Sequence, residues 1–135
     1  MTGVQTCALP ISRVRFLGFV NQSQLPAIYT AADVMVLPSE YEPFAVVVNE
    51  AMCCGCPVIA SDCVGACCDL IIPVSPGLVY RRADVAALTA ALRKMFAERD
   101  NRNSLGAAAR AHMKSWSPVQ NVIATVEAVR SSMRS

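Results

Sequence analysis

Charged residues are scarce in this chain of 135 residues. They make up 16% of the sequence, where globular proteins average about a quarter. Lysine and arginine are absent from positions 16 to 80, and ten of the twelve basic residues lie from Arg81 onward. A net charge of +2 by itself gives no indication of nucleic-acid binding. Apolar residues make up 54%, enough for one domain with a core, so we expect disorder only at the ends.

Long apolar runs are absent as well. Asn49, Glu50 and Asp62 interrupt the most apolar part of the chain, so no run of 18 apolar residues exists and no transmembrane helix is predicted. The first residues lack the basic segment and the long apolar core of a signal peptide. We interpret residues 1–12 as a non-native leader and residues 13–135 as the folded domain.

Cysteine is the one abundant metal-binding residue type, with seven copies, while histidine occurs once, at His112. Two separated Cys-x-x-Cys pairs, as in a zinc site, are not present. We therefore expect small buried thiols, with a metal site or disulfides as alternatives, and a structural or surface role for His112. An odd cysteine count without a secretion signal indicates the reducing cytoplasm.

Short apolar runs alternate with helical patterns along the chain. The expected strands are residues 14–17, 34–37, 57–61 and 78–80. The expected helices start near Asn21 or Ser23, at Pro43, after Asp84, at Asp100 and after Ser117. Asp84 is expected to cap its helix, and Gly55 is expected to end the helix that starts at Pro43. This alternation predicts an α/β fold: a Rossmann-like parallel sheet flanked by helices, with additional C-terminal helices. The loops after Leu17, Leu37 and Ser61 should meet at the ligand-binding edge.

Two glutamates bracket a short apolar stretch after the second expected strand. Glu42 is predicted to lie in the loop at a helix start, because Pro43 suits the first turn, and Glu50 is predicted two turns along that helix. Eight helical residues rise roughly 12 Å. An unpaired carboxylate at Glu50, among apolar neighbours, would be costly unless a ligand meets it.

The segment around these glutamates carries a specific resemblance. Glu-Pro-Phe at residues 42–44, Asn-Glu-Ala-Met at 49–52 and Cys-Gly-x-Pro-Val-Ile-Ala-Ser at 54–61 resemble the donor-binding C-terminal domain of retaining GT-B glycosyltransferases (family 4, or group 1). The likeness covers residues 14 to about 116. It implies that the chain is part of a longer hexosyltransferase-type enzyme of polysaccharide biosynthesis, whose N-terminal acceptor domain is absent.

The resemblance also implies the site. Glu42 would be the catalytic residue near the transferred sugar, and Glu50 would bind the ribose hydroxyls. Backbone N–H groups of Phe44, Ala45 and Val46 would bind the diphosphate, in agreement with the partial positive charge of a helix N-terminus. Gly18 and Phe19 would lie near the nucleobase. Glu40 is expected to be a solvated loop acid and Asp62 a loop cap.

Further expectations follow from the same resemblance. The substrate would be a nucleoside diphosphate sugar, the acceptor a carbohydrate or a lipid-linked molecule, and no cofactor or metal would be needed. The partners would be the donor and the acceptor domain, with no nucleic acid, and peripheral membrane association of the full enzyme is one option. Ala45 departs from the glycine usual in the family, which puts the sugar preference in question. The family's Arg and Lys for the diphosphate come from an upstream segment that this sequence lacks, so the chain alone should bind donor weakly and be inactive.

Other classes of function stay open at this point. A non-catalytic nucleotide-sugar-binding or interaction module could use the same sheet, and a GT-B sugar-nucleotide epimerase would bind similar donors with a different acid/base set. A cysteine-based metal protein is a further alternative, which metal analysis would detect. The spacing of the two glutamates together with Asn-Glu-Ala-Met favours the transferase.

Overall fold

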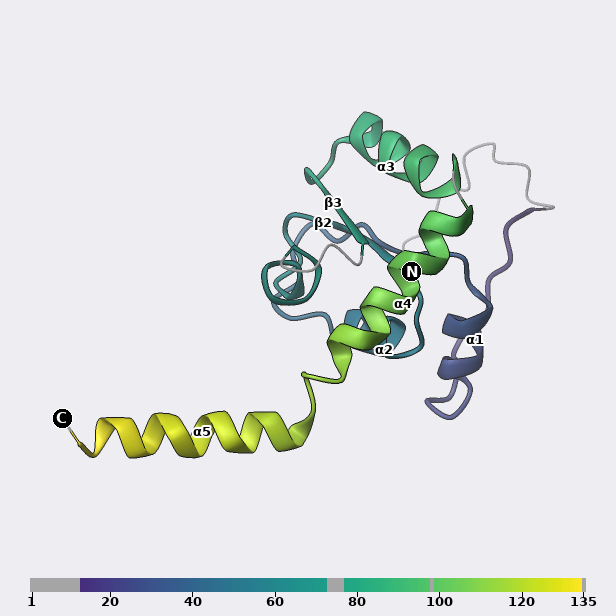
Figure 1. Cartoon of the computed structure of the whole chain (residues 1–135). Coiled ribbons are helices and arrows are strands. Elements are labelled where there is room, and N and C mark those ends of the chain that lie inside the picture. The colour runs from purple at the N-terminus through teal and green to yellow at the C-terminus, as the bar shows by residue number, and fades with distance from the viewer. Residues whose placement is uncertain (1–12, 73–76, 98, 135) are drawn as a thin grey trace, which may run out of the picture.

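A three-stranded parallel sheet lies at the centre of the fold (Figure 1). The computed structural model describes residues 13–72, 77–97 and 99–134. The strands are β1 (Met35–Leu37), β2 (Val58–Ser61) and β3 (Gly77–Tyr80), in the order β1-β2-β3. All four residues of β2 are buried, as expected of a central strand covered on both faces. Every pairing in this sheet is parallel, as the sequence predicted.

Helices cover both faces of the sheet. One core cluster packs β-strand side chains such as Val58 and Ala60 against α2 (Val46–Cys53), the π-helical turn η2 (Cys67–Ile71) and α4 (Arg99–Met113). The other packs Ile59 and Tyr80 against α3 (Val85–Ala97). Successive residues of β2 thus enter opposite clusters, as strand geometry requires. Together these contacts confirm the predicted α/β class.

Helix ends follow the sequence signals at two positions. Asp84 accepts a hydrogen bond from the backbone N–H of Ala87 (2.8 Å) and so caps α3. Gly55 follows the last turn of α2 with a φ of +75°, the left-handed conformation that ends many helices. Both features were predicted from the sequence.

The last helix, α5 (Pro118–Ser132), extends away from the rest of the domain (Figure 1). It has no buried residue, and its apolar side chains are exposed, among them Val119, Val122, Ile123, Val126 and Val129. Within residues 13–72, 77–97 and 99–134, no helix is both long enough and apolar enough to span a bilayer.

Three expectations about local structure are corrected. Residues 14–17 form no strand: Phe16 is 79% exposed, and the segment pairs with none of the described strands, so its backbone lacks the partner that a strand requires. The helix α1 (Leu25–Ala31) begins after Gln24 with no side-chain cap, rather than at a cap by Asn21 or Ser23. Ser117 is the N-cap residue of α5, but its hydroxyl contacts Gln120 instead of a backbone N–H. The predicted leader, residues 1–12, lies outside the described residues.

Candidate active site

The helix α2 starts three residues later than predicted. Ala45, its N-cap residue, has a φ of +70°. This conformation is left-handed and cannot be part of a right-handed α-helix. Pro43 therefore lies in the loop and not in the first turn, and Glu42 lies in the loop as expected. Glu50 is then the fifth residue of the helix, one turn along rather than two.

The loop that carries Glu42 is fixed by the loop after β2. Glu42 donates its N–H to the Cys63 carbonyl (3.1 Å) and accepts from the Gly65 N–H (2.8 Å), which forms an isolated parallel bridge. The Ser61 hydroxyl donates to the Ser39 carbonyl (2.5 Å), so the two loops are joined at a second point. Because these loops follow β1 and β2, the bonds hold them at the edge of the sheet where ligands of open α/β sheets bind.

Gly65 is required by this contact. A Cβ atom at this position would overlap with the carbonyl oxygen and carbon of Pro43. The backbone of the glutamate loop therefore approaches so closely that no larger residue fits without moving it. This close approach is the steric reason for a glycine at position 65.

The Glu42 carboxylate folds back onto the start of α2. Its Oε1 accepts hydrogen bonds from the N–H groups of Phe44 (3.2 Å) and Ala45 (3.1 Å). These are two of the three N–H groups that the resemblance assigned to a diphosphate. The remaining one, Val46, is the first helical residue, and helix geometry gives its N–H no intrahelical acceptor.

Ala45 is buried and has a strained backbone conformation. The stabilising and destabilising effects of replacing it with glycine nearly cancel. A non-glycine residue in the left-handed region costs roughly 1–2 kcal/mol, but Ala45→Gly would lose a buried methyl group worth about 0.8 kcal/mol and add chain entropy worth about 0.5–1 kcal/mol. We expect Ala45→Gly to change the free energy of unfolding by less than about 1 kcal/mol in denaturant titrations.

Ala83 provides the matched control for this substitution. It has a similar φ of +60° but is exposed, in the turn before α3. Ala83→Gly should therefore be the more stable of the two variants by about 0.8 kcal/mol, the value of the buried methyl group. A gain above about 2 kcal/mol for Ala45→Gly would contradict this account and show that Ala45 distorts the loop.

Glu50 faces α1 and meets a tyrosine there. The Tyr29 hydroxyl donates a hydrogen bond to Glu50 Oε2 (3.0 Å), and both residues are partly buried. Burial, with a further contribution from Glu50, raises the pKa of Tyr29 to about 12. The carboxylate expected to be unpaired thus has a partner within the chain, which holds one of its two oxygens.

A cavity of about 300 Å³ lies beside this pair, between α1 and α2. Its lining is mostly apolar and includes Leu25, Pro26, Tyr29, Glu50 and Cys53. Asn49 also lines it, and the Asn49 Oδ1 is a buried acceptor without a partner among the described residues. An apolar cavity with a few polar groups at one side is typical of small-molecule sites.

The hydrogen bond between Tyr29 and Glu50 predicts a pH effect. Because the folded-state pKa of Tyr29 is raised from 10 to about 12, the associated stability is complete below pH 10 and is lost as the pH rises toward 12. In an NMR titration of the tyrosine rings, we expect Tyr29 to ionise well above pH 10.

Glu50→Gln should lower the pKa of Tyr29 only in part, since burial is the larger cause. A pKa of Tyr29 that does not change in Glu50→Gln would show that the tyrosine does not bond to Glu50 in solution.

The predicted site residues do not all line this cavity. The residues around it do not include Glu42, Phe44, Ala45 or Val46, which lie at the start of α2. Gly18 and Phe19 lie in the loop before α1; Gly18 has a φ of +66°, and Phe19 is 97% exposed. Since residues 14–17 are no strand, the predicted meeting of three strand-end loops is reduced to the two after β1 and β2.

Sequence reasoning missed Tyr29 and Asn49 as site residues. Glu50 and Cys53 are three residues apart on α2, and Leu25 and Tyr29 are four residues apart on α1, so each pair lies on one helix face. That spacing could have indicated two facing helices. It could not have shown that Tyr29, which also packs against the core, directs its hydroxyl at Glu50.

The other candidate residues lie outside this site. Asp62 accepts a hydrogen bond from the Arg82 N–H (2.8 Å), which confirms its role in the loop, and Glu40 is exposed. His112 lies on α4 with its ring 6.1 Å from the Trp116 ring, and its Nε2 is buried.

The described cysteines divide into three groups, of which Cys54 and Cys63 are half-buried. Cys56 and Cys67 are buried, as predicted, and burial raises the pKa of the Cys67 thiol to about 11, which disfavours the thiolate that binds metals. Cys53 and Cys68 are exposed, which corrects the expectation for them: Cys53 faces the cavity beside Glu50, and the buried face of η2 carries Cys67, Leu70 and Ile71 instead of Cys68. The described residues contain no group of three or more His, Cys, Asp or Glu that could hold a metal ion, and their cysteines are free. Cys7 lies outside the described residues.

Comparisons with known proteins give consistent matches. The family model described as "Glycosyl transferases group 1" matches residues 8–112, beginning inside the predicted leader. The 2-deoxystreptamine N-acetyl-D-glucosaminyltransferase of Streptomyces fradiae is 44% identical over 79 residues, which cover 58% of this chain and 18% of that protein.

Two solved structures align over 90% of the chain. Sucrose-phosphate synthase from Thermosynechococcus elongatus aligns with a TM-score of 0.77, at 34% identity and over 31% of its length. Alr3699/HepE from Anabaena, solved in complex with UDP, aligns with a TM-score of 0.75, at 26% identity and over 33% of its length. The chain spans about a third or less of these relatives, and both alignments confirm the predicted fold.

Proposed function

Since this chain belongs to the group 1 glycosyl transferases, we propose that it forms the donor-binding part of a larger enzyme that transfers a sugar from a nucleoside diphosphate sugar. The proposed acceptor is a carbohydrate or a lipid-linked molecule, and the anomeric configuration is retained. One observation carries the proposal: the Glu50 carboxylate stands beside an apolar cavity and is held by Tyr29 through one oxygen.

In this proposal Glu50 binds the ribose. Tyr29 occupies Oε2, and Oε1 of the same carboxylate accepts hydrogen bonds from the vicinal hydroxyls. Hydrogen bonds to a charged acceptor are roughly twice as strong as neutral ones, so this contact is worth a large share of nucleotide affinity. The adjoining apolar cavity receives the nucleoside. The solved relative that holds UDP supports a nucleotide as the ligand.

The start of α2 holds the diphosphate. Its partial positive charge and its N–H groups favour an anion, and they stabilise the leaving group when the bond to the sugar breaks. The Glu42 carboxylate already accepts from Phe44 and Ala45 in the structure, so a diphosphate at these donors competes with it. We propose that the displaced Glu42 carboxylate turns to the hydroxyl groups of the sugar. The resemblance implies that an upstream Arg and Lys complete the anion site.

The acceptor is bound by a separate domain of the same enzyme. The exposed apolar stripe of α5 supports this, because such a stripe on a helix that leaves the domain is suited to cover by further protein. The proposal includes no cofactor and places the enzyme in the cytoplasm, with peripheral membrane association as an option for the full enzyme. The isolated chain is proposed to bind donor weakly and to catalyse no transfer.

Calorimetric titration of this chain with UDP, GDP and ADP tests the proposal. We expect saturable binding of one nucleotide, weaker at high salt because the diphosphate contact is electrostatic. Transfer of a sugar by the isolated chain would contradict the assignment of catalysis to the larger enzyme. Absence of binding for all three nucleotides at millimolar concentration would contradict the assigned donor site.

A further inference from the structure

A second cavity, of about 530 Å³, is larger than the one beside Glu50 and lies between α4 and the end of α1. Basic side chains of α4 and of the turn after it dominate its polar lining: Arg102, Arg110 and Lys114. Asp33 is the acidic residue of the lining, so the formal charge around the cavity is +2. Of all lining residues, Cys54 is the one shared with the cavity beside Glu50.

The hollow follows from the residue spacing on α4. Positions 102, 106 and 110 are four apart and therefore lie on one face of α4, and Lys114 follows the last helical residue, Met113, in the turn after it. Gly106 packs directly on the Gly55 carbonyl, with which a Cβ atom would overlap, and so brings α4 against the end of α2. Between the long basic side chains stand only small residues, Gly106 and Ala107, which leaves the space open.

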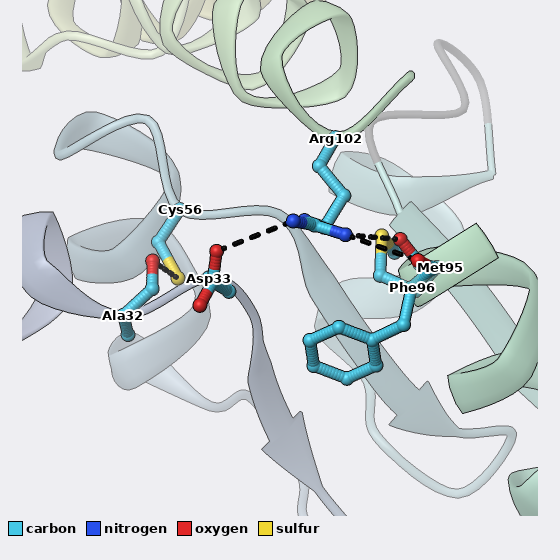
Figure 2. A network of polar contacts seen from close by, with 6 residues as sticks. All are labelled: Ala32, Asp33, Cys56, Met95, Phe96 and Arg102. Carbon is cyan, nitrogen blue, oxygen red and sulfur yellow. Dashed lines mark hydrogen bonds and ion pairs between the residues drawn. The ribbon is translucent and has the colours of Figure 1, made fainter. Parts of the chain in front are cut away.

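Arg102 forms one wall of the cavity, and contacts with three other residues hold its guanidinium in place (Figure 2). Its guanidinium forms an ion pair with Asp33 (3.5 Å), donates hydrogen bonds to the carbonyls of Met95 and Phe96, and stacks over the Phe96 ring. Arg102 thus joins α4 to α3 and neutralises Asp33. Because Asp33, the acidic residue of the lining, pairs with Arg102, the other two basic residues, Arg110 and Lys114, have no acidic partner in the lining.

Arg110 and Lys114 are available for a ligand. Arg110 donates one hydrogen bond, to the Cys54 carbonyl (2.8 Å), out of the five N–H groups of a guanidinium. Within the described part of the chain, the Lys114 ammonium has no hydrogen-bonding or ionic partner. Both residues are exposed; Arg110 lies on the last turn of α4, and Lys114 lies in the turn that follows Met113.

We propose that this cavity binds the phosphate group of a small phosphorylated molecule, through Arg110 and Lys114. A guanidinium matches two phosphate oxygens at once, and a lysine adds a point charge beside it. The volume is in the range of small-molecule sites, and the concave, polar and basic lining suits an anion that is not extended. The site is distinct from the proposed donor site, so the two assignments can fail independently.

The test uses NMR titration of this chain with inorganic phosphate at low ionic strength, with assigned backbone signals. We expect saturable shifts at Asn103, Gly106 and Arg110, and an affinity at least fivefold lower in Lys114→Gln. Arg130→Gln is the matched control, because it removes the same charge from the exposed face of α5. The control should keep the affinity of the unchanged chain. Arg110→Gln is a less clean variant, since it also removes the bond to Cys54.

Vesicle sedimentation distinguishes the two sources of a phosphate group. Vesicles of phosphatidylcholine with phosphatidylglycerol at a ratio of four to one present the group on a lipid. If the site binds small molecules, phosphate binding should depend on Lys114, and no vesicle binding that depends on Lys114 should be seen. Vesicle binding that depends on Lys114, without saturable shifts from free phosphate, would overturn the small-molecule assignment. Equal phosphate affinities of Lys114→Gln and Arg130→Gln, or an absence of saturable shifts, would overturn the site altogether.

Discussion

Gly65→Ala is expected to destabilise the domain by about 3 kcal/mol, at the upper end of the cost of overpacking. The added Cβ would overlap with backbone atoms of Pro43, which cannot move aside as a flexible side chain could. The bridge between Glu42 and Val64 must open to make room. In thermal denaturation the midpoint should fall by roughly 10 °C, and nucleotide binding should weaken because the start of α2 is displaced.

Gly18→Ala is the control for this substitution. Gly18 has a φ of +66°, but a Cβ atom there would meet nothing within 4 Å. Its replacement therefore tests backbone strain without crowding, and it should cost about 1 kcal/mol or less. If Gly65→Ala is no more destabilising than Gly18→Ala, the loop after β2 does not support the glutamate loop as described.

Glu50→Gln is expected to weaken nucleotide binding by about 10- to 100-fold. A hydrogen bond to a charged group contributes about 1.5–3 kcal/mol, and tenfold in affinity corresponds to about 1.4 kcal/mol. Glutamine keeps the shape of the side chain and an oxygen for Tyr29, so the fold should be retained. Calorimetric titration with the nucleotide that binds the unchanged chain measures the loss.

Glu40→Gln is the control for the charge. Glu40 precedes Glu42 in the same loop but is exposed, and the resemblance gives it no contact with the donor. Its replacement should change the affinity by less than twofold, as expected of a screened surface charge. Equal losses in the two variants would mean that the general negative charge of this edge, and not a contact of Glu50, affects binding.

Where neighbouring residues determine an element, the sequence predicted it correctly. Asp84 caps α3 through the N–H three residues on, and Gly55 ends α2 because glycine adopts a positive φ without cost. The strand β2 was recognisable as a short apolar run between turn residues. These features depend on contacts within a few positions of the chain, which a single sequence contains.

Elements that depend on distant partners were predicted less well. The apolar residues 14–17 resemble a strand, yet strand formation requires a neighbour that the described sheet does not provide. The start of α2 was predicted at Pro43, because a proline in a loop and one in a first turn share the same φ. The helix starts at Val46 instead, because Ala45 has a left-handed conformation. Backbone hydrogen bonds join the loop before Ala45 to the loop after β2.

The same distinction applies to the candidate site. The spacing of Glu42 and Glu50 was read from the motif, but their surroundings were not. Tyr29 lies 21 residues before Glu50, and no local pattern connects the two. The hydrogen bonds from Phe44 and Ala45 to Glu42 were also missed, although a carboxylate before a helix commonly accepts from its first N–H groups.

A crystal structure of this chain with the bound nucleoside diphosphate tests the central claim most directly. We predict that the ribose hydroxyls lie within hydrogen-bonding distance of Glu50 Oε1, and that the diphosphate lies at the N–H groups that begin α2. A nucleotide bound elsewhere, such as in the basic cavity of α4, with Glu50 still contacting Tyr29 alone, would contradict the assignment.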